Sequence, residues 1–171
     1  MYDPSSEQIA ANAVPPVSSR SLFRYFDDVH DLYRATIEEQ QRRSVHIVNR
    51  DLHAGAPLAD RIAAIAEQRA ELWTVLGPSA RTARLRAHAS DAIADSIAVT
   101  RRFLRLQAAQ LFAEELAAMP DEVAVSRLAA IDTLLEWESW SLFIDDRGFD
   151  AARASEALRH ALTALLTPLE S

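Results

Sequence analysis

The chain has 171 residues, no cysteine and a formal charge of -7 at neutral pH, from 18 basic and 25 acidic residues. This length suits a domain that buries roughly 70% of its unfolded surface. Without cysteine the chain has neither a disulfide framework nor a thiolate metal site, and no apolar run approaches the ~20 residues of a membrane span, so we expect a cytoplasmic protein. The acidic balance excludes a surface covered by nucleic acid but leaves room for a small local DNA-reading surface.

The composition predicts an all-α fold. The chain has only 3 glycines, is rich in alanine, leucine, arginine and glutamate, and does not alternate apolar and polar residues for long. Serine or aspartate caps and proline or glycine breaks bound the expected helices, which cover residues 5–13, 18–26, 28–50, 58–76, 79–87, 90–119, 120–144 and 150–167. Among the breaks, Gly77-Pro78 is expected to end the helix over residues 58–76, and Asp150 is expected to cap the last helix.

The second expected helix, over residues 18–26, has two different faces. At about 100° per residue, Leu22 and Phe26 share one side, whereas Arg20 and Arg24 lie one turn apart on nearly the opposite side. One face is therefore suited to burial, and the other offers two guanidinium groups. A short helix and a turn precede this helix, and that order is typical of a helix-turn-helix that reads DNA. The alternative is an ordinary surface helix of an arginine-rich protein.

Two segments near the start of the chain read IAANA, residues 9–13, and VSSRSLFRYFDDVHDLYRA, residues 17–35. Together they resemble the helix-turn-helix of the TetR family of bacterial transcriptional regulators, and the segment over residues 134–166 resembles the last two helices of many members. The resemblance implies a truncated helix-turn-helix DNA-binding domain over residues 1–33. It also implies a helical effector-binding and dimerisation domain over residues 34–171.

The resemblance assigns DNA contacts to Ser18, Ser19, Arg20, Ser21, Phe23, Arg24 and Tyr25. Of these, Ser19, Arg20 and Phe23 would face base edges in the major groove. Tyr25 and the two other serines would hold phosphates, and Arg24 would do either. The implied protein is a repressor that binds double-stranded operator DNA as a homodimer and is released by a small-molecule effector. It needs no cofactor and no membrane.

Three features depart from the family pattern. The first helix of the family, which precedes the loop matched by Tyr2-Asp3, is missing, so we expect Leu22 and Phe26 to lose part of their cover. The turn reads Val-Pro-Pro-Val where the family usually has a glycine and a valine. Val29 stands where the family usually has a lysine that contacts a phosphate. The loss of that contact lowers the affinity for DNA and makes the affinity less dependent on salt. The alternative function is therefore a dimeric helical ligand-binding or interaction protein that does not bind DNA in this truncated form.

Four large rings and one amide are candidates for effector contact: Trp73, Phe103, Gln107, Trp137 and Trp140. The rings are large enough to line an apolar pocket, although the hydrophobic core is the alternative for each of them. Gln107 lies on the apolar line of the helix over residues 90–119, where a buried amide needs a hydrogen-bond partner. That partner is an effector, a backbone carbonyl or a neighbouring arginine.

Small and apolar residues recur along the last helix and the segment over residues 134–142. The candidate dimer residues are Leu134, Leu158, Ala161, Leu162 and Leu165. The two helices would form a four-helix bundle with their two-fold mates. The alternative is that they pack onto the core of their own chain.

Catalytic and metal-binding patterns find no support in the sequence. The 5 histidines show no HExxH or similar ligand spacing, and 3 glycines do not make a phosphate-binding loop. The adjacent pairs Glu114-Glu115 and Asp145-Asp146 are typical of solvated charge. We therefore predict no catalytic site and no metal site, and we expect a protein that is not an enzyme.

Overall fold

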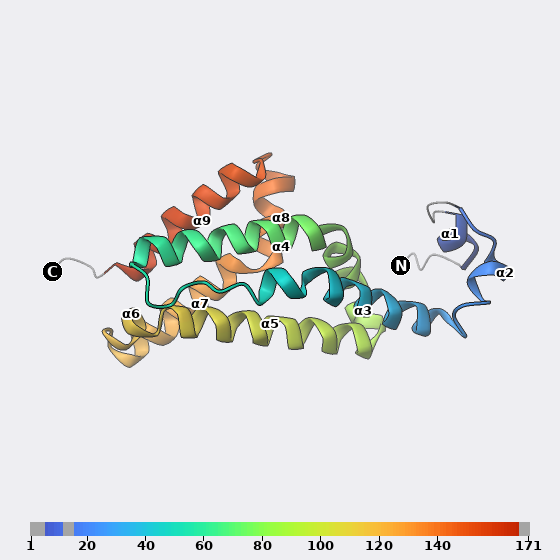
Figure 1. The fold of residues 1–171 in the computed structure, drawn as a ribbon, viewed down its shortest axis with the longest axis horizontal. Helices are drawn as coiled ribbons and strands as arrows, with labels where there is room; N and C mark the ends of the chain where they lie inside the picture. Colours follow the sequence, from blue (N-terminus) through green and yellow to red (C-terminus); the bar gives the residue numbers. More distant parts are fainter. Residues whose placement is uncertain (1–5, 12–15, 168–171) are drawn as a thin grey trace. The chain divides into compact units, whose positions relative to one another are not determined.

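A computed structural model of the chain describes residues 6–11 and 16–167, but not the side chains of Ser6, Ile9, Ala11, Ser19, Leu22, Val29, His30 and Tyr33. The described residues form helices and no strand, which confirms the all-α fold class for that part of the chain (Figure 1). The helices are α1 Ser6–Ala11, α2 Ser19–Leu22, α3 Val29–Val48, α4 Leu58–Arg86, α5 Asp91–Leu111, α6 Ala113–Ala117, α7 Asp121–Leu135, α8 Trp137–Ser141 and α9 Ala151–Leu166, with a 3-10 turn η1 Ala87–Ala89 and a π-helical turn η2 Leu142–Asp146. The expected start and end of the first helix, at residues 5 and 13, lie outside the described residues.

The chain divides into two compact units, Met1–Gln41 and Arg42–Ser171. The division falls within α3, whereas the sequence predicted it after Tyr33. In the first unit α1 and α2 contact one another, and the Val17 N–H donates to the carbonyl oxygen of Ala10 at 3.0 Å. Ala10 is buried, so this short helix pair has a small interior of its own.

The second helix is shorter than predicted, because α2 ends at Leu22 and residues 23–25 form a turn. The Arg24 N–H donates to the carbonyl oxygen of Ser21 at 3.3 Å, which closes that turn. Asp28 then caps α3 by accepting from the Asp31 N–H at 2.7 Å. A helix of one turn has little intrinsic stability, so α2 does not extend to residue 26. The cap residue Asp28 is itself outside the helix, so α3 begins as a separate element.

In the second unit α4 is the central helix and packs against α5, α8 and α9 (Figure 1). The buried side of α9 includes Ala154, Leu158, Leu162 and Leu166, at the four-residue spacing of one helix face, together with Ser155. Residues from these helices form two clusters of buried apolar side chains. The Asp150 side chain caps α9 as predicted, accepting from the Arg153 N–H at 2.8 Å.

The predicted helix end at Gly77-Pro78 is wrong, because α4 continues through both residues to Arg86. Proline inside a helix removes one hydrogen bond and costs about 3 kcal/mol. Tertiary contacts offset this cost. Gly77 allows the Trp137 ring so close that an added Cβ would lie 3.2 Å from it, and the Arg84 Nε lies 3.1 Å from a carboxylate oxygen of Glu138.

Two further predicted helices are interrupted where the backbone leaves the helical region. The helix expected over residues 90–119 breaks at Phe112, with φ -110° and ψ 22°, and the one expected over residues 120–144 breaks at Glu136, with φ -78° and ψ 160°. Phe112 is fully buried at its break. Glu136 precedes α8, whose Trp137 and Trp140 both enter the core. Burial of these aromatic rings explains breaks that helical periodicity does not reveal.

Arg61 joins α4 to the C-terminal end of α5 and to α6. It is 4% exposed. Its guanidinium donates to the carbonyl oxygens of Ala56 and Leu111, and one terminal nitrogen lies 3.0 Å from a carboxylate oxygen of Glu115. This ion pair is bidentate, because the second terminal nitrogen also contacts Glu115.

The hydrogen bond from Arg61 holds the pKa of Glu115 below the ordinary value of 4.5. A carboxyl group whose pKa is lower in the folded state contributes stability that is present above its unfolded-state pKa and is lost as the pH falls through its folded-state pKa. We therefore expect the difference in unfolding free energy between the wild type and Glu115→Gln to stay constant from about pH 7 to about pH 5 and to shrink below about pH 4. Urea unfolding at each pH measures it, and a difference that persists at the acid end would contradict the assignment.

Candidate functional site

The predicted DNA-contact residues lie on α2 and the turn that follows it. Apart from Ser19, whose side chain lies outside the described part of the structure, all of them are exposed. Phe23 is 45% exposed and Tyr25 is 76% exposed, which is unusual for side chains of this size. Ser18 caps α2, accepting from the Ser21 N–H at 3.1 Å, and the two hydroxyl oxygens lie 2.9 Å apart.

The arginines of this segment are available for a partner. Among the described residues neither Arg20 nor Arg24 forms an ion pair, whereas the carboxylates of Asp28 and Asp31 are engaged elsewhere. Asp28 caps α3, and Asp31 lies 3.0 Å from the guanidinium of Arg34. Both carboxylates thus act at the start of α3.

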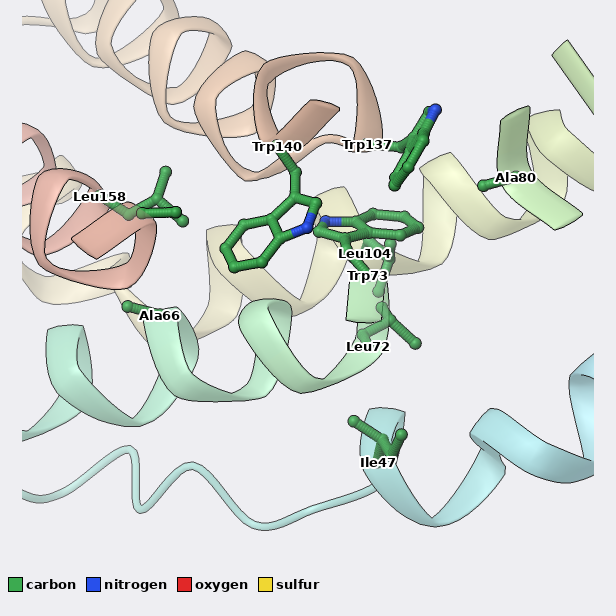
Figure 2. Close-up of a cluster of buried hydrophobic side chains, with 10 residues drawn as sticks. Ile47, Ala66, Leu72, Trp73, Ala80, Leu104, Trp137, Trp140 and Leu158 are labelled. Carbon is green, nitrogen blue, oxygen red and sulfur yellow. The ribbon is translucent and has the colours of Figure 1, made fainter. Parts of the chain in front are cut away.

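Three of the predicted effector residues meet in one buried cluster (Figure 2). Trp137 and Trp140 reach from α8 toward Trp73 on α4. The rings of Trp73 and Trp137 have centroids 6.2 Å apart and meet edge to face. The Trp73 indole N–H donates to the carbonyl oxygen of Leu135 at 2.9 Å, so the polar end of this ring already has a partner.

Phe103 does not belong to this cluster. It is 44% exposed on the outer face of α5, whereas the next residue, Leu104, is 3% exposed and faces the core. Neighbouring positions on a helix point about 100° apart, so Leu104 and Phe103 do not face the same partner. The structure therefore does not place Phe103 with the other predicted effector residues.

Gln107 is half-buried, and its amide has protein partners. Its Nε2 donates to the carbonyl oxygen of Val48 at 2.8 Å, and its Oε1 accepts from the Arg69 guanidinium at 3.0 Å. These are the backbone carbonyl and the neighbouring arginine that the sequence left open as alternatives to an effector. Gln68 is placed similarly, with its Nε2 donating to the carbonyl oxygen of Ile47 at 2.9 Å.

Arg69 is the member of this site that the sequence prediction missed. It is fully buried and donates to the side-chain oxygens of Gln68 and Gln107 and, at 3.3 Å, to the carbonyl oxygen of Leu104. Burial lowers its pKa to about 10, so the side chain stays positive at neutral pH. A signal was present, because Arg69 interrupts the apolar stripe of α4 four residues after Ile65.

A network of two arginines and two glutamates lies beside the aromatic cluster. Arg101 on α5 and Arg84 on α4 both contact Glu136 and Glu138, which flank Trp137. Burial raises the pKa of Glu136, and the charge of Arg101 offsets only part of this effect. Burial also acts to raise the pKa of Glu138, but hydrogen bonds and the charges of the two arginines outweigh it and hold the pKa below its usual range. The network ties the start of α8 to two other helices.

The predicted dimer residues lie against the interior of their own chain. Leu158 and Leu162 are 1% and 0% exposed. Leu134 and Leu165 pack against the two core clusters, and Ala161 is half-buried. This packing matches the alternative that the sequence left open for this helix, and it leaves Leu158 and Leu162 too deeply buried to contact a second copy.

No group of three or more histidine, aspartate or glutamate side chains that could hold a metal ion occurs among the described residues. In the same part of the chain, no helix combines the length and apolar character needed to cross a membrane. Compared with protein-family models, curated proteins and solved structures, the chain matches none.

Proposed function

We propose that the chain is a TetR-like transcriptional regulator, a repressor that binds operator DNA as a dimer and is released by a small-molecule effector. The observation that carries the proposal is the exposed surface of α2 and its following turn. Two arginines without ion-pair partners in the described part of the chain, two large exposed aromatic rings and two serine hydroxyls gather there within eight residues. The negative net charge of the chain does not by itself account for this exposed set of arginines, aromatic rings and hydroxyls.

The chemistry of this surface suits duplex DNA. Arginine forms bidentate contacts with guanine edges and with phosphates, and serine and tyrosine hydroxyls donate to phosphate oxygens. An exposed phenylalanine offers an apolar contact for a thymine methyl group. In this proposal Arg20 and Phe23 read bases, while Ser18, Ser21 and Tyr25 position the chain on the backbone.

The second unit would then supply the response to an effector. Its aromatic cluster and the polar groups around Arg69 lie among α3, α4, α5 and α8. Release would be a population shift between conformations that differ in how α3 leaves this unit, because an effector acts only through its different affinities for the two states.

Fluorescence anisotropy on the DNA upstream of the chain's own gene tests the proposal. We expect binding that weakens steeply with salt. Arg20→Ala should reduce the affinity by roughly 10–100-fold, since a base-contacting arginine contributes about 1–3 kcal/mol. The matched control is Arg159→Ala, an exposed arginine on α9 that should leave the affinity unchanged.

Two outcomes would count against this function. Equal losses for Arg20→Ala and Arg159→Ala would show that general charge, rather than α2, attracts the DNA. An absence of binding would favour the alternative of a helical ligand-binding or interaction protein that does not bind DNA. Sedimentation velocity tests the dimer separately, because a monomer of 19.0 kDa would contradict it.

A further inference from the structure

α4 carries two buried arginines, Arg61 and Arg69, eight residues apart on the same helix. Each donates to a backbone carbonyl of α5, Arg61 to Leu111 and Arg69 to Leu104. The two sites are therefore built alike on the same pair of helices. They differ in the residue that supplies the second acceptor.

At the first site that acceptor is a carboxylate, because Arg61 faces Glu115. At the second site it is a neutral amide, because Arg69 faces Gln107, eight residues before Glu115. The remaining acceptors of Arg69 are the amide oxygen of Gln68 and a main-chain carbonyl, and both are neutral. The Nε–H of Arg69 is buried and has no acceptor among the described residues.

The nearest acidic side chains do not fill this role. Asp132 and Glu136 act on Arg69 through space only. Asp132 lies 2.9 Å from Arg105, and Glu136 lies 3.2 Å from Arg101, so both carboxylates are paired with other arginines. A buried guanidinium without a direct counter-charge is costly, since burial removes its hydration and neutral acceptors replace only part of it.

We propose that Arg69 is the point at which the effector site recognises an anion, and that the effector carries a carboxylate group. This inference rests on the proposed effector-responsive function. A carboxylate would accept from the free Nε–H and from one terminal nitrogen, the bidentate geometry that arginine favours. Trp73 follows one turn later on α4, and its buried ring belongs to the apolar cluster beside this site.

The same site explains how an anion would act on α3. Gln68 and Gln107 hold the carbonyl oxygens of Ile47 and Val48, the last two residues of α3, while their own oxygens accept from Arg69. Both amide oxygens accept from one terminal nitrogen of Arg69, whereas the carboxylate would bind Nε and the other terminal nitrogen, so it would neutralise the guanidinium without displacing either amide. Neutralising this charge would weaken the hydrogen bonds by which Arg69 orients the two amides against the end of α3.

Thermal unfolding with acetate as the probe tests the inference, because it measures binding without DNA. Sodium acetate is compared with sodium chloride at equal ionic strength and with acetamide, the neutral analogue. We expect acetate alone to raise the melting temperature in a saturable way, by about 3 °C at a tenfold excess over its Kd. Equal effects of acetate and chloride, or of acetate and acetamide, would overturn the proposal.

A matched pair of variants locates the site. Gln107→Glu places a carboxylate beside Arg69 and should abolish the acetate response, whereas Gln110→Glu makes the same change on the exposed face of α5 and should keep it. A response that persists in Gln107→Glu would refute the assignment to Arg69. If acetate binds as expected while the chain fails to bind DNA, the anion site stands and the regulatory function fails.

Discussion

Glu115→Ala is expected to lower the free energy of unfolding by about 3–5 kcal/mol, the range seen when one partner of a buried ion pair is removed. The reason is the burial of Arg61, which is 4% exposed and would keep its charge without a carboxylate. The effect should also loosen the end of α5, because the same guanidinium holds the carbonyl oxygen of Leu111. Urea unfolding followed by far-ultraviolet circular dichroism measures the change.

The adjacent residue gives a matched control. Glu114 is exposed, so Glu114→Ala removes the same charge from the same turn and should cost less than about 1 kcal/mol. Combining Glu115→Ala with Arg61→Met should recover part of the loss, since no buried charge then remains unpaired. Equal effects of the two single alanine variants would mean that the ion pair contributes nothing beyond surface charge.

Trp73→Ala should be of similar size, with a loss of about 3–5 kcal/mol, because it leaves a large cavity in the core. Trp73 is 3% exposed and lies against Trp137 and the other apolar residues of its cluster. The change also leaves the carbonyl oxygen of Leu135 without the indole donor, which adds the cost of an unpaired buried acceptor. Circular dichroism is again the suitable probe, since the substitution removes a fluorophore.

Phe103→Ala is the control for this prediction. Phe103 lies on α5 but is 44% exposed, so its truncation should cost well under half as much. Trp73→Phe separates the two contributions, because it keeps an aromatic ring and loses the hydrogen bond. If Phe103→Ala proved as destabilising as Trp73→Ala, the exposed face of α5 would have to be covered by something other than its own chain.

Both predictions concern the same central helix. Arg61 and Trp73 lie on α4 on either side of Arg69, and each is held by a partner within the chain. Arg69 differs from Arg61 because its acceptors are neutral. The two stability measurements therefore describe two fixed points of α4 on either side of Arg69, against which an effect of an anion at Arg69 is judged.

The sequence by itself determined the helical class, the starts of most helices and the cap at Asp150. These are local properties, because helix propensity, side-chain caps and prolines act within a few residues along the chain. The same local signals marked Ser18 and Asp28 as caps, and both caps are present. Local signals also singled out Gln107 as an amide in need of a partner.

Only the tertiary structure decided where helices continue or break, and which polar groups meet. α4 passes Pro78 because Gly77 packs against Trp137, and the chain breaks at Glu136 because α8 must direct two indole rings inward. In both cases the packing partners, Gly77 on α4 and Trp137 on α8, lie about sixty residues apart along the chain, beyond the reach of any local pattern. For the same reason the sequence pointed to Gln107 but did not reveal Arg69, whose burial and lack of a carboxylate exist only when α3, α4 and α5 come together.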